Sequence, residues 1–188
     1  PELPTMPTPT PTLNPKYVYK VPVQPTAAPN ARFYSDKADK YYKDGKYQQA
    51  INEFTTLLRL NPSHGYAYLL RGNAYGRLGQ YQQAIQDYDQ GIQLVPSYAL
   101  AYYNRGHAYS KLGQYQRASQ DADKAIQLDP SYAKAYLIRS IAYTLLGQYQ
   151  RASQDTDKAI QLDPGNANAY AGRSLAYRNL GKYAKADA

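Results

Sequence analysis

Apolar and aromatic residues return in this chain at a fixed spacing of 34 residues, from Ala31 to the last residue. Anchored on the prolines that close them, the units run 31–64, 65–98, 99–132 and 133–166, with a partial fifth at 167–188. We number the positions of each unit from 1, so that Ala31 occupies position 1. Self-similarity at such a period indicates stacked supersecondary units that bury their apolar faces against one another.

The first part of each unit predicts a helix. Tyrosine occupies positions 4 and 11, and a small residue lies between them at position 8. Positions 4, 8 and 11 share one face of an α-helix, and the small residue allows a neighbouring helix to come close. The position-8 residues are Ala38, Gly72, Gly106, Ser140 and Ser174. We therefore expect a first helix over about positions 2 to 14.

A second helix follows in the pattern. Glycine fills position 15 of all five units, where a helix C-terminus favours a residue with positive φ. Tyrosine at position 17, alanine at position 20 and Ile or Leu at positions 28 and 30 then precede the closing proline. The position-15 residues, each expected to end a first helix, are Gly45, Gly79, Gly113, Gly147 and Gly181.

Taken together, these aromatic, small, Tyr, Gly, Tyr, Ala, apolar and Pro positions resemble the tetratricopeptide repeat over about 158 of the 188 residues. The resemblance implies an all-α fold: a right-handed solenoid of antiparallel helix pairs, with four full repeats and a partial fifth, preceded by an extended tail. At position 24 the expected aromatic becomes Ala122 and Thr156, which predicts looser or differently shaped packing in repeats three and four.

Position 7 departs from the family pattern in a second way, because arginine replaces the usual leucine in repeats two to five. A ladder of arginines could hold phosphates. We favour packing against aspartates of the same repeat, which would neutralise the guanidinium groups. The arginines concerned are Arg71, Arg105, Arg139 and Arg173.

Residues 1–30 differ sharply from the repeats and hold nine of the 13 prolines. Such a Pro/Thr-rich tail cannot form a core of its own. Its Thr-Pro sequence is similar to that of stalk segments in exported proteins, which weakly favours an extracytoplasmic or cell-surface location. A plain spacer has the same composition equally often. Within it, Tyr17, Tyr19, Val21 and Val23 alternate to one side, as in an extended peptide that docks on a surface.

Composition narrows the function classes. The net charge is +8, yet basic and acidic residues alternate in the second helices, which favours solvated faces over nucleic-acid binding. There is no cysteine, and no apolar run is long enough to span a membrane. His64 and His107 are isolated from any triad or metal-ligand spacing, and no phosphate-binding glycine loop is present. We predict a non-enzymatic protein without metal or cofactor, and without direct membrane insertion.

The resemblance also implies a binding groove, because first helices of tetratricopeptide repeats face a ligand at positions 2, 5, 9, 12 and 13. Some family members grip a C-terminal carboxylate with Lys, Asn, Asn, Lys and Arg; here Leu69 and Ile138 replace the outer cations, which argues against such a clamp. The expected groove is therefore mainly apolar. Its residues are Tyr66, Leu69, Asn73, Tyr103, Asn104, His107, Lys134, Leu137, Ile141, Leu145 and Leu175.

Two functions remain. We favour a scaffold that assembles head to tail with copies of itself, because neither end of the repeat array shows a polar capping unit. Its tail would dock on a neighbouring protomer. The alternative is an adaptor whose groove binds an extended or helical segment of another protein. The self-association residues expected for the first are Tyr17, Tyr19, Val21, Val23, Phe33, Tyr34, Tyr170, Tyr177 and Leu180.

Overall fold

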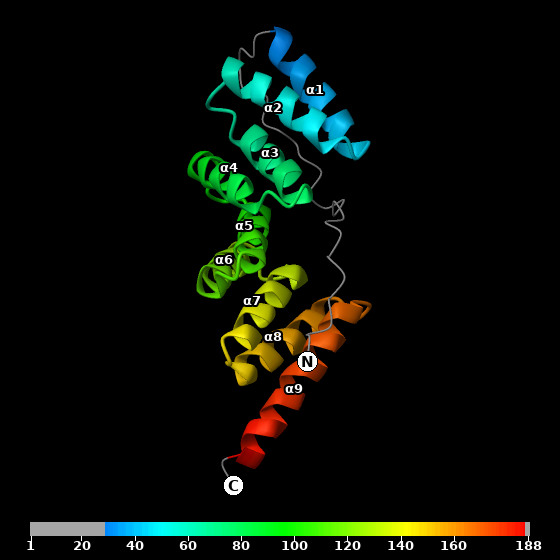
Figure 1. Cartoon of the computed structure of the whole chain (residues 1–188), viewed down its shortest axis with the longest axis vertical. Helices are drawn as coiled ribbons and strands as arrows, with labels where there is room; N and C mark the ends of the chain where they lie inside the picture. Colours follow the sequence, from blue (N-terminus) through cyan, green and yellow to red (C-terminus); the bar gives the residue numbers. More distant parts are fainter. Residues whose placement is uncertain (1–28, 187–188) are drawn as a thin grey trace.

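A computed structural model describes residues 29–186, with side chains from 31 to 181. Over this range the chain forms α-helices and no strand (Figure 1). In chain order they are α1 (Pro29–Lys43), α2 (Tyr47–Leu60), α3 (Gly65–Arg77), α4 (Tyr81–Leu94), α5 (Ala99–Lys111), α6 (Tyr115–Leu128), α7 (Ala133–Leu145), α8 (Tyr149–Leu162) and α9 (Ala167–Ala186).

The helices pack in sequence order into an elongated right-handed solenoid, with α1 at one end and α9 at the other (Figure 1). Each helix packs against the next, as expected for stacked helix pairs. The first helices of repeats two to five, α3, α5, α7 and α9, also contact one another in turn. Elements on the inside of a curved stack lie closest together, so these first helices form the inner side.

Four of the five position-15 glycines end their helices as predicted. Gly45, Gly79, Gly113 and Gly147 have φ of +73 to +74°, and the backbone reverses there into the second helix. Gly181 is different, because α9 runs through it to Ala186. The expectation that a helix ends at Gly181 was therefore wrong.

Position 24 packs against position 8 in the second repeat. Tyr88 lies so close to Gly72 that a Cβ on Gly72 would come within 2.9 Å of the ring. In repeat four the smaller Thr156 is fully buried opposite Ser140, which is buried as well. The site is thus filled without the aromatic, and the packing is differently shaped without being open.

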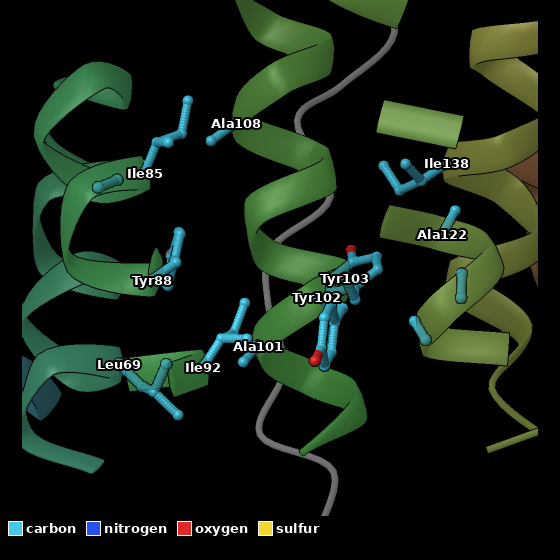
Figure 2. Close-up of a cluster of buried hydrophobic side chains, with 13 residues drawn as sticks. Leu69, Ile85, Tyr88, Ile92, Ala101, Tyr102, Tyr103, Ala108, Ala122 and Ile138 are labelled. Carbon is cyan, nitrogen blue, oxygen red and sulfur yellow. The ribbon is translucent and has the colours of Figure 1, made fainter. Parts of the chain in front are cut away.

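The main core cluster runs from α3 to α7 without a break at repeat boundaries. Figure 2 shows its side chains, from Leu69 and Tyr88 through Tyr102 and Tyr103 to Ile138, between successive helices. A core that is continuous across repeats couples them into one structure. It also fixes the positions of the residues on the inner side.

Candidate protein-binding surface on the first helices

The inner face comprises positions 2, 5, 6, 9, 12 and 13 of α3, α5, α7 and α9. On a helical wheel these positions lie opposite positions 4, 8 and 11, which pack against the second helix of the same repeat. Ala67 and Gly72 illustrate the packed side of α3, and both are buried. The remaining side is therefore the surface that the curved stack presents inward.

An amide pair joins two neighbouring first helices on the inner face. The Nδ2 atom of Asn104 on α5 donates to Oδ1 of Asn73 on α3 at 2.8 Å, and the Tyr88 hydroxyl donates to the same oxygen at 2.8 Å. Within the described residues, Asn73 Nδ2 and Asn104 Oδ1 make no hydrogen bond. The pair is half-buried and offers one free donor and one free acceptor.

His107 lies one turn beyond Asn104 on α5. Its Nε2 atom is buried without a hydrogen-bond partner among the described residues. Burial, together with a smaller effect of the positive charge of Lys111, lowers the pKa of His107 to about 4. The imidazole is therefore neutral at physiological pH and contributes a polar but uncharged group to the inner face.

Two residues expected to line an apolar groove are core residues instead. Leu69 is 3% exposed and packs against Gly91 of α4, where only a glycine leaves room for it. Tyr103 is 5% exposed, with its ring centroid 5.1 Å from that of Tyr132, and burial raises the pKa of its hydroxyl to about 12. The expectation that they face a ligand was wrong, because both side chains, at the edge of the helical face, turn into contacts with residues of their own repeat.

The other expected groove residues remain accessible to different degrees. Leu145 is exposed, and the rest of the set is half-buried: Tyr66, Asn73, Asn104, His107, Lys134, Leu137, Ile141 and Leu175. The structure therefore brings together a polar centre on α3 and α5 and a partly apolar stretch on α7 and α9. Ile138, which occupies the place of a clamp cation, is itself buried.

The position-7 arginines bind aspartates, as expected. Arg105 makes two parallel hydrogen bonds to Asp121 of its own repeat, at 2.8 and 2.6 Å. It also donates to Asp89 of the preceding repeat at 2.6 Å. Its guanidinium lies over the rings of Tyr102 and Tyr109.

Arg139 repeats this arrangement with Asp155 of its own repeat and Asp123 of the preceding one. The cross-repeat bond was not anticipated. Its signal in the sequence is an aspartate at position 25, 16 residues before the next arginine. Arg71 binds Asp87, and Arg173 reaches Asp157 at 3.5 Å.

The two ends of the array expose aromatic side chains. Phe33 on α1 is 60% exposed, and on α9 Tyr170 is 42% and Tyr177 53% exposed. Tyr34 and Leu180 are half-buried. The tail residues predicted to take part, Tyr17, Tyr19, Val21 and Val23, lie outside the described residues.

Chemical sites of other kinds are not apparent in the part of the chain that the structure describes. No group of three or more His, Cys, Asp or Glu side chains could hold a metal ion there. His64 caps the N-terminus of α3, where its side chain accepts a hydrogen bond from the backbone N–H of Ala67. None of the helices from 29 to 186 is both long and apolar enough to cross a membrane.

The family assignment follows from comparison with known proteins. Models of the tetratricopeptide repeat match residues 38–79, 72–113, 99–132, 133–166 and 156–188. The chain is a tetratricopeptide-repeat protein. No curated protein matches it.

Solved tetratricopeptide-repeat structures resemble this one closely. The crystal structure of MamA superimposes with a TM-score of 0.76 at 29% identity, covering 80% of this chain and 82% of that one. The first repeat domain of Spaghetti (RPAP3), bound to the HSP90 peptide SRMEEVD, gives 0.61 at 29% identity, covering 62% and 93%. The second domain of human RPAP3, with the HSP70 peptide SGPTIEEVD, gives 0.57 at 36% identity, covering 60% and 98%. The fold thus supports a role in protein interaction.

Proposed function

We propose that this tetratricopeptide-repeat protein is a non-enzymatic interaction scaffold whose inner face binds an extended segment of a partner protein. The observation that carries the proposal is the amide pair of Asn73 and Asn104. It presents one unused donor and one unused acceptor across two adjacent repeats. A peptide backbone carries the same two groups at every residue, so the pair can hold an extended chain irrespective of its side chains.

The surroundings of the pair support this assignment. Leu137, Ile141 and Leu175 continue the inner face with half-buried apolar side chains that a bound segment would cover. Two solved relatives, RPAP3 domains at 29 and 36% identity, were determined with bound peptides. Their fold places first helices in a comparable array.

Selection from a random peptide display library, followed by hydrogen exchange of the complex, tests the proposal. Selected peptides should protect amides of α3, α5 and α7, and Asn104→Ala should weaken binding by about ten-fold, since it removes two hydrogen-bonding atoms from a partly buried site. Asn52→Ala on the exposed side of α2 is the control and should leave affinity unchanged. Peptides that protect only second helices would contradict the proposal.

Self-assembly is a second candidate, favoured by the exposed aromatics at opposite ends of the array, Phe33 on α1 and Tyr170 and Tyr177 on α9. A head-to-tail contact would cover both ends, and contacts of this kind that do not close produce filaments. The segment Tyr17–Val23 could add to it by docking on a neighbouring protomer, because alternating Tyr and Val side chains suit an apolar surface.

Light scattering on the full chain tests this candidate. If the ends associate, Tyr177→Glu should reduce particle mass to that of a monomer while circular dichroism shows unchanged helicity. Deletion of residues 1–28 should also weaken assembly if the tail docks. A wild-type protein that is monomeric at high concentration would rule out this second function.

A further inference from the structure

The edge of the array where the first helices begin carries apolar side chains in repeats one to three. The two helices of a pair run antiparallel, so the N-termini of the first helices and the C-termini of the second helices lie at the same edge. Leu60 and Leu94 are the last residues of α2 and α4, and they are 45% and 44% exposed. Tyr66, near the start of α3, lies edge-on to Tyr98, with the two ring centroids 5.6 Å apart.

Val95 adds to this surface through a departure from the repeat pattern. Position 31 is Asn or Asp in repeats one, three and four, and each of these side chains accepts a hydrogen bond from a residue of its own turn. Repeat two has Val95 at this position, and a valine side chain cannot accept such a bond. Repeat two has therefore exchanged a polar turn residue for an apolar one.

A second departure accommodates the valine. Position 1 is alanine in the other four repeats and Gly65 in repeat two. A Cβ on Gly65 would come within 2.6 Å of Cγ2 of Val95 and 2.8 Å of Cβ of Leu94. The glycine thus lets Leu94 and Val95 lie directly against the start of α3.

We call Tyr66, Leu94, Val95 and Tyr98 the edge patch. Leu94 is exposed, the other three are half-buried, and none of the four carries a charge. Leu60 continues the patch towards α1. Connected apolar side chains beside a turn that lacks its polar residue are typical of a surface that another segment covers.

We infer that the edge patch binds the chain's own segment Tyr17–Val23, within one molecule. This segment lies outside the described residues, and the argument for it comes from its sequence. Tyr17, Tyr19, Val21 and Val23 alternate to one side of an extended chain, and Lys20 falls on the other. A segment docked by its apolar side covers the patch and leaves the lysine in water.

The length of chain before α1 suits this contact. Val23 precedes Pro29, the first residue of α1, by six residues, and Tyr17 precedes it by 12. An extended Pro-rich chain rises about 3.1 Å per residue, so these two residues reach about 19 and 37 Å from α1. The patch begins on α3, two helix spacings of about 8–10 Å each from α1. The segment can therefore reach the patch of its own chain.

This contact is separate from the proposed function, which assigns a segment of another protein to the inner face. The amide pair of Asn73 and Asn104 takes no part in it. It also differs from docking of the tail on a neighbouring protomer, because it requires no second copy of the chain.

The test keeps the full chain and competes its tail against a labelled peptide, PKYVYKVPVQPT, which reproduces residues 15–26. The variant Tyr17→Ser/Tyr19→Ser removes two rings from the tail and should leave the patch accessible. Fluorescence anisotropy should show at least about ten-fold tighter binding of the peptide to this variant than to the wild type. In the wild type the attached segment competes at an effective concentration of about 1 mM.

Changes in the patch, made in the same variant, locate the site. Leu94→Gln and Val95→Asp should each weaken peptide binding by about ten-fold, since each removes apolar surface from the contact. Val95→Asp restores the residue type of repeats three and four, so the turn should be preserved. Leu112→Gln is the matched control, because Leu112 is 39% exposed at the opposite edge. Neither it nor Asn104→Ala should change the affinity.

Disulfide trapping distinguishes contact within one chain from contact between two. The chain has no cysteine, so Val21→Cys with Leu94→Cys introduces only two thiols. Mild oxidation with copper phenanthroline in dilute solution should give a cross-linked monomer on a non-reducing gel. Val21→Cys with Leu112→Cys is the control and should give no cross-link.

The possible results separate clearly. Equal binding of the peptide to the wild type and to the tail variant, or binding that neither patch change weakens, would overturn the edge patch as the site. Cross-linked dimers in place of monomers would assign the segment to a neighbouring protomer and overturn the intramolecular contact. None of these results bears on the library selection, which tests the inner face.

Discussion

His107 shows how the surroundings of a single residue set its charge state. In the folded chain its pKa is lowered to about 4, mainly by burial, whereas an exposed histidine titrates near 6.5. The unfolded chain therefore takes up the proton first as pH falls. The stabilising contribution is complete above pH 6.5 and is lost progressively between 6.5 and 4.

We expect wild-type protein to lose about 2 kcal/mol more stability than His107→Gln between pH 7.5 and pH 4.5. Urea unfolding of both proteins at the two pH values gives this difference, in which the titration of the carboxylates common to both cancels. Identical pH dependence of the two proteins would show that folding does not lower the pKa of His107.

Helical periodicity could not reveal the burial of His107, Leu69 or Tyr103. All three occupy positions opposite the packed side, which a helical wheel marks as exposed. Leu69 is covered by packing against Gly91 of α4 and Tyr103 lies beside Tyr132, contacts that the periodicity of a single helix does not contain. The arginine–aspartate pairs within a repeat were predictable, since both residue types recur at a constant spacing of 16.

At the scale of elements, position 15 provides a matched pair of glycines. Gly113 has φ of +73° and turns the chain from α5 into α6, whereas Gly181 lies within the continuous helix α9. A Cβ strains the first conformation and suits the second.

Gly113→Ala should therefore destabilise the protein by about 1 kcal/mol, and Gly181→Ala should stabilise it by about 0.5–1 kcal/mol. Thermal and urea unfolding measure both changes. A loss of stability in Gly181→Ala comparable to that in Gly113→Ala would mean that the first helix ends at Gly181 after all.

The sequence pattern predicted both helices of the first four repeats, because the apolar periodicity, the position-15 glycine and the closing proline all agreed with the packing. It failed at Gly181 because a glycine permits a turn without requiring one. After Gly45, Gly79, Gly113 and Gly147 a 14-residue helix packs back and stabilises the reversal. Beyond Gly181 the described chain continues only to Ala186, and it extends the existing helix instead.

At the scale of the whole molecule, the position-7 arginines join neighbouring repeats. Each repeat also has core contacts of its own. Arg139 pairs with the buried Asp155 within its repeat and with the exposed Asp123 of the repeat before it. Loss of a buried partner leaves a buried charge unpaired, whereas exposed pairs contribute little.

Asp155→Asn should cost about 2–3 kcal/mol, and Asp123→Asn less than about 1 kcal/mol. Double-mutant cycles with Arg139→Gln, followed by urea unfolding, separate each pair from the effects of the single changes. Equal coupling energies for the two pairs would show that exposure does not govern their strength.

At this scale the solenoid followed from the repeat length, whereas the ion pairs between neighbouring repeats did not. The alternation of acids and bases along the second helices indicated ordinary solvated faces. The three-dimensional arrangement shows instead that the aspartates of α4, α6 and α8 are bound by the position-7 arginines.

The cross-repeat bond also gives the array a direction. Arg105 and Arg139 each find one aspartate in the preceding repeat and the other 16 residues further along the chain. The chain leaves the ribosome N-terminus first. A new first helix can therefore bind the aspartate of the preceding repeat before the aspartate of its own repeat has been synthesised. Each repeat can therefore dock on a completed template as it emerges, and the solenoid can grow in the order of translation.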